Sequence, residues 1–341
     1  MKKDSTSRGL RPWQWIFLLL LIVGTGFILR KHNSETVWQE SEGKIFGTYY
    51  SVKYLHAESL DSTILAALKQ VDGSLSMFNP QSTVSQINRN VAVSVDSLFA
   101  EVFQLSQQVA TQTDGSFDVT VAPLVNAWGF GFEKSDSVVP QHIDSLLQYV
   151  GYEKVSLSDG RLHKSHPSTQ LDFSAIAKGY GVDCVARVLS EQGAEDFLVN
   201  IGGEIVSRGH RSDGQPWRVG IETPDTLSDV SLKAYLELTD AALATSGNYR
   251  RFYYKDGVRY AHTIDPHTGY PVNHTLLSAT VVAKTCALAD AYATAFMVMG
   301  LDKSKAFVAQ HPEVSAYFIH ALPNDSLAVW ASEGMQRLLV E

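Results

Sequence analysis

Near the end of this chain lies an apolar, helix-forming run, Cys286–Met299, that contains one carboxylate, Asp290, and one turn later the hydroxyl of Thr294. A helix that is apolar on nearly every face is normally buried, and burying an ionised, unpaired Asp costs several kcal/mol. No basic residue lies within the run, so Asp290 needs a partner from outside it. Because Asp290 and Thr294 are four residues apart, both oxygens project from one helical face and suit a hard cation such as Mg²⁺. The alternative is an Asp that caps a loop or bonds a buried backbone amide.

Composition limits the function. The 341 residues are 45% apolar and 19% charged, which is typical of a globular protein with a sizeable core. The net charge of −8 argues against a nucleic-acid partner, because such proteins usually carry a basic face. An anionic substrate would then need a metal or local basic groups. Cys184 and Cys286 lie in apolar helical patterns, so we expect small core residues rather than a disulfide.

The N-terminal segment predicts a membrane anchor. Residues 13–29 are mostly apolar and approach the roughly 20 residues needed to cross a bilayer. Four basic residues precede this stretch, which favours a cytoplasmic N-terminus and an exported remainder. No A-x-A-like cleavage site or lipidation Cys follows, and Arg30 and Lys31 come next, so an uncleaved anchor is favoured over a signal peptide. The expectation is a single-pass inner-membrane protein with its globular part on the periplasmic, extracytoplasmic side.

The expected organisation has three parts: a cytoplasmic N-terminus with the transmembrane anchor at 1–32, a polar linker at 33–42, and one domain at 43–341. Alternating patterns predict strands at 48–54, 197–201, 204–208, 217–222, 232–238, 242–245 and 278–283. Helical spacing is found at 60–71, 98–113, 142–150 and 182–189. Helices mixed with short, turn-linked strands indicate an α+β domain with antiparallel sheets.

Two glycine-containing segments are candidate ligand sites. In Leu171–Asp183, Lys178, Gly179 and Gly181 stand where an apolar segment turns into a helix. Such a helix start can hold a phosphate on free amides or offer a carbonyl to a metal, or it can be a turn required by packing. Asn200–Glu204 contains Gly-Gly, which indicates either a tight hairpin or a backbone that a cofactor approaches closely.

Other segments offer side chains for chemistry. Thr245–Asn248 ends a strand in small polar residues that either face a ligand or cap the next element. His262 is either an acid-base group or a core histidine. Phe46 and Phe78 stand beside turn residues, where an aromatic ring can stack on a flat heterocycle or pack in the core. No Walker, HExxH or nucleophile-elbow motif is present.

The residues of these segments, and their order along the chain, resemble the ApbE family of FAD:protein FMN transferases. The matching pieces are Phe46–Thr48, Ser76–Asn88, Gly115–Val121, Leu171–Asp183, Asn200–Glu204, Ala244–Gly247, His262–Gly269 and Ala289–Thr294. The resemblance implies a T-fold-like α+β architecture. It also implies an enzyme that splits the pyrophosphate of FAD and attaches FMN through a phosphoester to a Thr or Ser hydroxyl of an acceptor protein, releasing AMP.

By the same resemblance the family is Mg²⁺-dependent, and the metal ligands would be the Ala177 carbonyl, Asp290 and Thr294. The implied flavin contacts are Phe46, Phe78, Ser116, Phe117, Asp118, Ser174, Tyr180 and Ile264. His262 and Asp118 are the candidates for the base that deprotonates the acceptor. The expected acceptor is a subunit of a membrane redox complex. A Mg²⁺-dependent FAD pyrophosphatase and a non-catalytic flavin-binding or delivery protein are the competing functions.

Overall fold

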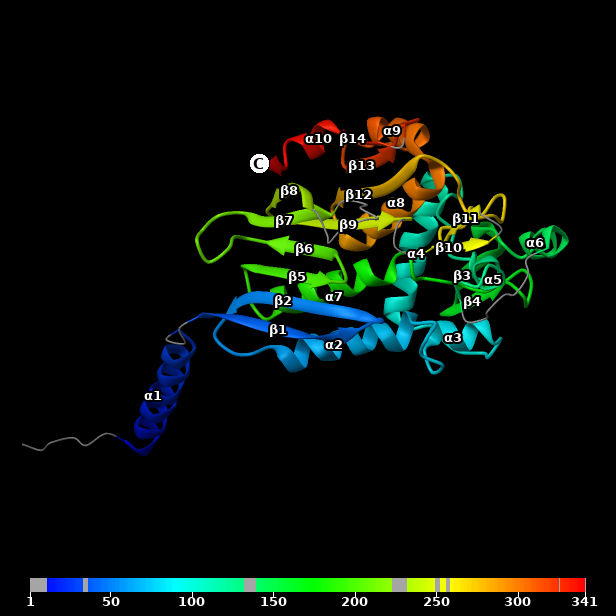
Figure 1. Ribbon diagram of the computed structural model, residues 1–341. Helices are drawn as coiled ribbons and strands as arrows, with labels where there is room; N and C mark the ends of the chain where they lie inside the picture. The colour runs from blue at the N-terminus through cyan, green and yellow to red at the C-terminus, as the bar shows by residue number, and fades with distance from the viewer. Residues whose placement is uncertain are drawn as a thin grey trace, which may run out of the picture.

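The computed structural model describes residues 11–32, 36–131, 139–222, 232–248, 252–255, 258–324 and 326–340. Among these residues, eight strands form one antiparallel sheet in the order β1-β2-β5-β6-β9-β12-β13-β14 (Figure 1). Their bounds are β1 Val37–Ile45, β2 Thr48–His56, β5 Phe197–Ile201, β6 Glu204–Arg208, β9 Ala241–Gly247, β12 Leu276–Ala283, β13 Ser315–Ala321 and β14 Leu327–Ala331. A smaller sheet, β15-β8-β7, consists of Leu339–Val340, Leu232–Leu238 and Trp217–Glu222. Two hairpins, β3-β4 (Val155–Ser158, Arg161–Lys164) and β10-β11 (Phe252–Lys255, Val258–Ala261), complete the described strands.

Helices cover one face of the large sheet and the small sheet covers the other. The helices that carry the core are α2 Asp61–Leu75, α4 Ser97–Gln112, α7 Ala177–Glu191 and α8 Cys286–Met299. The remaining ones are α3 Thr83–Asn88, α5 Ala122–Ala127, α6 Pro140–Leu147, a 3₁₀ turn at Tyr152–Lys154, α9 Leu301–Gln310 and α10 Glu333–Gln336. Alternation in β12 shows how the layers meet: Val281 packs under the helices, whereas Val282 packs against the small sheet.

The α+β architecture with antiparallel sheets fits the prediction. β5, β6, β7 and β8 have the predicted bounds, and the helix read from the Asp290 run is α8. These elements were predictable because their periodicity is strong and turn residues bound them. β1 begins at Val37, inside the stretch assigned to the linker. Cys184 and Cys286 are buried free thiols, as expected of core residues.

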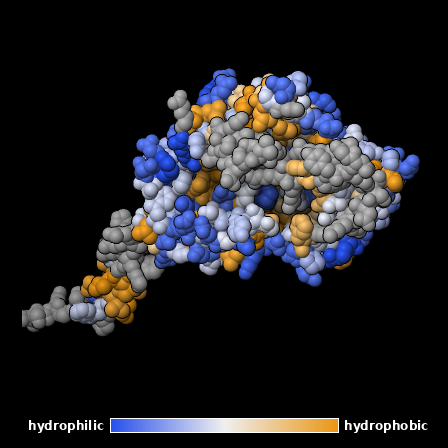
Figure 2. All heavy atoms as spheres, in the orientation of Figure 1, coloured by the Kyte–Doolittle hydropathy of each residue, from blue (hydrophilic) through white to orange (hydrophobic). Residues whose placement is uncertain are grey.

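The predicted transmembrane anchor is wrong. Residues Pro12–His32 do form a helix, α1, which stands apart from the sheets in Figure 1, and most of its described side chains are apolar and exposed, as the orange surface in Figure 2 shows. However, no helix among the described residues is both long and apolar enough to span a membrane. The 21 residues of α1 include polar or charged residues near both ends, so its apolar part is shorter than the roughly 20 residues that a span needs. The prediction of a single-pass inner-membrane protein with a periplasmic domain rested on this anchor and is therefore also wrong.

Candidate functional site

Asp290 finds its partners on α7, far away in sequence. Its Oδ2 accepts a hydrogen bond from the backbone N–H of Gly179 at 3.1 Å. Its Oδ1 lies 3.8 Å from Lys178 Nζ. The carboxylate is almost fully buried, as the apolar run around it required. The alternative considered from the sequence, a bond to a buried backbone amide, is therefore observed. Among the described residues, the partner of Oδ1 is the more distant Lys178 ammonium.

Helices α7 and α8 cap each other. At α7, Ile176 stands at the N-cap without a side-chain hydrogen bond, and Asp290 accepts from Gly179, the third residue of the helix. In return, Asp183 of α7 accepts from the N–H groups of Cys286 and Ala287 at the start of α8, both at 2.8 Å. The N–H groups of the first helical turn have no acceptor within the helix and need one from outside it. The two carboxylates thus fix how far α8 slides along α7, and with it the place of Asp290.

The glycines of the Lys178–Gly181 segment serve close packing. A Cβ built on Gly179 would lie 2.3 Å from the Cys286 carbonyl oxygen, which is backbone and cannot move aside. A Cβ on Gly181 would lie 2.7 Å from Cε2 of Phe46. The packing-driven turn considered from the sequence is therefore what forms here. Gly202 and Gly203 adopt φ of 65° and 106° in the β5-β6 hairpin, as the Gly-Gly pair predicted.

Lys178 joins two buried carboxylates. Its Nζ lies 2.6 Å from Glu204 Oε1, and Glu204 follows the Gly-Gly turn. The other oxygen, Oε2, is buried and has no hydrogen-bond partner among the described residues. Burial raises the pKa of Glu204 to about 7, although Lys178 beside it acts in the opposite direction. Burial lowers the pKa of Lys178, but Asp290 and Glu204 outweigh it and raise that pKa. With both acids ionised, the cluster carries one negative charge more than positive.

The raised pKa of Glu204 predicts a pH-dependent stability. Between its ordinary pKa near 4.5 and about 7, the folded protein holds a proton that the unfolded chain has released, so stability falls as pH rises through this window. Between pH 5 and 8, the free energy of unfolding of the wild type should fall by on the order of 2 kcal/mol more than that of Glu204→Gln. Urea unfolding in EDTA measures this. Glu40→Gln, in an exposed pair with Lys53, is the control. If the free energy of unfolding changes with pH in the same way in the wild type and in Glu204→Gln, Glu204 is not the group responsible.

The predicted metal ligands gather where α7 meets α8. Thr294 follows Asp290 by one helical turn, and its hydroxyl lies 3.5 Å from that of Ser246 at the end of β9. Ala177 is the first residue of α7, two residues before the Gly179 amide that Asp290 binds. No group of three or more His, Cys, Asp or Glu side chains suited to a metal occurs among the described residues. The oxygen-rich set that does occur, with its orphaned Glu204 oxygen and the net negative charge that it carries once Glu204 is ionised, fits a hard divalent cation.

Phe46 adopts a strained backbone conformation. With Gly47 it forms the two-residue turn between β1 and β2, and its φ is 51°, a region that a bulky residue rarely occupies. The ring lies against Gly181 of α7. Strain of this kind commonly marks positions held for function, and it favours a ligand contact for Phe46.

The other predicted flavin contacts differ in exposure. Phe78 is 72% exposed, Ser174 is exposed, and Ser116 is half-buried. Four are buried: Phe117, Asp118, Tyr180 and Ile264. The Tyr180 hydroxyl donates to Glu101 of α4 at 2.6 Å, so this buried side chain is directed toward α4. A ligand can thus reach the ring of Phe78 from solvent directly, but not that of Tyr180.

The two candidate bases have different surroundings. Asp118 is buried, and its Oδ1 accepts from both the N–H and the hydroxyl of Thr120 at 2.7 Å. Burial raises the pKa of Asp118, opposed by these hydrogen bonds. His262 is half-buried, with its ring centroid 6.4 Å from that of Phe130. Because a base must reach a substrate proton, the greater exposure of His262 favours it over Asp118.

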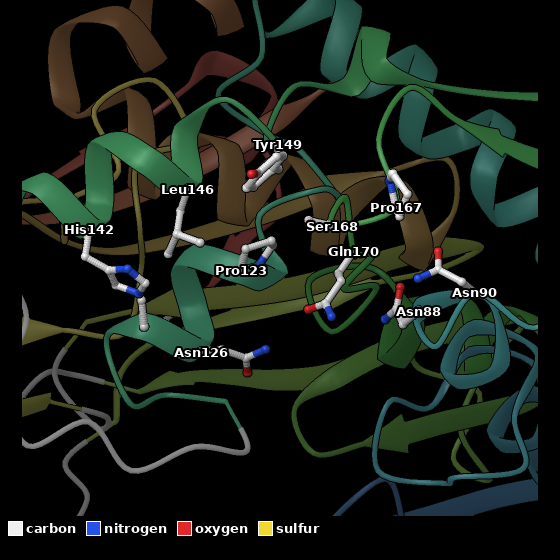
Figure 3. Close-up of a pocket in the computed structure, with 11 residues that line it drawn as sticks. Asn88, Asn90, Pro123, Asn126, His142, Leu146, Tyr149, Pro167, Ser168 and Gln170 are labelled. Atoms are coloured by element: carbon white, nitrogen blue, oxygen red, sulfur yellow. The ribbon is translucent and has the colours of Figure 1, made fainter.

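A separate open cavity of about 470 Å³ lies between α5, α6 and the 167–170 segment (Figure 3). Its walls include Pro123 and Asn126 on α5, His142 and Leu146 on α6, and Gln170. None of the described lining residues is an acid, Lys or Arg. It therefore lacks the charges that a pyrophosphate or a metal would require, and none of the predicted site residues lines it.

Sequence reasoning did not assign roles to Lys178, Glu204 or Asp183. The first two occur in the motifs noted, but their pairing with Asp290 joins three separate segments of the chain. Asp183 also stands in an apolar helical pattern, but Arg187 follows it by one turn, so the sequence offered it a local partner and did not indicate its role as a cap for α8.

Known proteins resemble the chain over most of its length. The sequence profile of the ApbE family matches residues 46–318. The FAD:protein FMN transferase of Haemophilus influenzae is 36% identical over 88% of this chain and 91% of its own. That of Vibrio cholerae is 37% identical over 87% and 91%, respectively. The solved structure of the flavin transferase ApbE from Vibrio cholerae superposes with a TM-score of 0.82 at 35% identity, covering 89% of this chain and 99% of that one.

Proposed function

This chain belongs to the ApbE family, and from that premise we propose that it is a Mg²⁺-dependent FAD:protein FMN transferase. The acceptor is a protein with an accessible Thr or Ser hydroxyl. That oxygen attacks the phosphorus of the FMN half of FAD, and a phosphoester bond forms. The bond between this phosphorus and the pyrophosphate bridging oxygen breaks, and AMP leaves with that oxygen. The hydroxyl proton passes to a base, for which His262 is the first candidate and Asp118 the second.

The observation that carries the proposal is the cluster of oxygens where α7 meets α8, which bears a net negative charge once Glu204 is ionised. Asp290, Thr294 and the Ala177 carbonyl would hold Mg²⁺, which neutralises the pyrophosphate charge during phosphoryl transfer. When ionised, Glu204 balances Lys178, so that the ammonium does not cancel the charge of Asp290. Phe46 and Phe78 offer aromatic rings for the flavin, Phe46 from a strained turn and Phe78 from an exposed position.

The test is direct. The purified protein is incubated with FAD and Mg²⁺, with and without a candidate acceptor, and AMP, free FMN and the acceptor mass are measured. We expect AMP and a covalent FMN adduct only when the acceptor is present, and neither when EDTA replaces Mg²⁺. Replacing the acceptor Thr by Val should abolish the adduct. Rapid free FMN and AMP without acceptor would instead establish a pyrophosphatase, and FAD binding without any turnover would establish a delivery protein. That the acceptor belongs to a membrane redox complex stays a prediction.

A further inference from the structure

We propose that His267, in its doubly protonated form, is a positioning residue that holds together two loops of the flavin site. The first loop, residues 114–118, contains the predicted contacts Ser116, Phe117 and Asp118. The second loop, residues 262–269, contains His262 and Ile264. The inference rests on the proposed function, because the role of these loops comes from it.

The imidazole of His267 bridges the loops with both of its nitrogens. Nε2 lies 2.7 Å from the backbone carbonyl oxygen of Asp114, 153 residues away in sequence. Nδ1 lies 3.0 Å from Oδ1 of Asp265, within the second loop. The first loop comes close because Gly115 has no side chain: a Cβ there would lie 3.2 Å from His267 Nε2. The ring therefore contacts the backbone of one loop and a carboxylate of the other.

The Asp114 carbonyl accepts hydrogen bonds but cannot donate them, and the same holds for the Asp265 carboxylate when it is ionised. A neutral imidazole has one N–H and can donate to one of them, whereas the imidazolium has two and can donate to both. The complete bridge therefore needs the protonated ring. Removing the second proton from an imidazole leaves one N–H, which can serve only one of the two acceptors.

The charged groups on the segments beside the ring are mostly acidic. Besides Asp265, these segments carry the carboxylates of Asp114 and of Glu153 on the 3₁₀ turn, together with the phenol of Tyr152. The cation of the same turn, Lys154, donates to the carbonyls of Leu147, Gln148 and Val150. A cationic His267 offsets the negative charge of these carboxylates, whereas a neutral His267 does not. Loss of the second proton thus removes a hydrogen bond and an attraction at once.

The second loop is stiff enough to transmit a change at His267. Gly269 N–H donates to the Asp265 carbonyl, Asp265 N–H donates to the Tyr270 carbonyl, and the Thr268 hydroxyl donates to Asp265 Oδ2. Releasing His267 from Asp114 therefore removes a direct link between this hydrogen-bonded turn and the first loop. The consequence should fall on flavin binding more than on the chemical step, because the ring touches neither of the predicted metal-binding helices.

The experiment measures FAD affinity, by flavin fluorescence, and the KM for FAD and kcat in FMN transfer, from pH 6 to 8.5. In the wild type, we expect FAD binding to weaken about two- to fivefold as pH rises, a range set by the modest strength of partly exposed ion pairs. His267→Arg stays charged and keeps several donors, so its affinity should remain high and flat. His267→Gln has no titratable group and should bind weakly at all these pH values.

A matched control is His311→Gln, since His311 also pairs with a carboxylate, Glu313, at 3.0 Å but lies outside the two loops. It should follow the wild-type profile. If His267→Arg and His267→Gln both keep the wild-type pH dependence of FAD affinity, the inference is overturned. FAD binding needs no acceptor, so absence of FMN transfer in every variant would refute the proposed function while the binding profiles still decide the role of His267.

Discussion

Asp290→Asn should reduce Mg²⁺-dependent FMN transfer at least about 100-fold while leaving the fold intact. The Asn side chain keeps an oxygen that accepts from the Gly179 N–H, so the cap on α7 survives. The change removes the negative charge that faces Lys178 at 3.8 Å and that is predicted to hold the metal. AMP release in the presence of acceptor measures the activity, and titration with Mn²⁺ measures metal affinity separately.

Two comparisons make this prediction specific. Asp302→Asn changes an exposed carboxylate in the first turn of α9 and should leave both measurements unchanged. The melting temperature of Asp290→Asn should stay within a few degrees of the wild type, because the buried hydrogen bond is retained. An Asp290→Asn protein that is folded, binds Mn²⁺ normally and transfers FMN at the wild-type rate would show that the carboxylate only caps α7.

Asp290 also shows how far sequence reasoning reached. Helix α8, its burial and the need for a partner followed from local composition, because hydrophobic periodicity and the cost of burying charge act within a short segment. The identity of the partner did not follow. Lys178 and the Gly179 amide reach Asp290 only because β5, β6 and β9 place α7 beside α8, and no pattern within either helix encodes that pairing.

The same distinction explains the other outcomes. Strands β5 to β8 were predicted with their bounds because turn residues border each alternating run. The reciprocal cap by Asp183 was missed, since its acceptor role depends on a helix start 103 residues away. The anchor prediction failed at α1 because an apolar run with polar ends resembled a span without reaching the required length.

Gly179→Ala should destabilise the protein by roughly 3 kcal/mol, since overpacking a rigid contact costs about that much. The added methyl group would lie 2.3 Å from the Cys286 carbonyl oxygen and 2.9 Å from the Ala287 nitrogen, both in the first turn of α8. To accept it, α8 must move away from α7, which lengthens the bonds that Asp183 and Asp290 make across the contact. Metal affinity should therefore fall together with stability.

The matched control for Gly179→Ala is Gly73→Ala, which replaces a helical glycine in α2 where nothing lies within 4 Å of the added Cβ. Alanine favours a helix over glycine by about 0.5–1 kcal/mol, so this control should be slightly stabilised. Urea unfolding and Mn²⁺ titration of both variants give the comparison. If Gly179→Ala is also stabilised and binds Mn²⁺ like the wild type, the close approach of α7 to α8 does not set the geometry of the site. If stability falls but Mn²⁺ affinity does not, the helices still pack tightly, but Asp290 holds its place without their reciprocal caps.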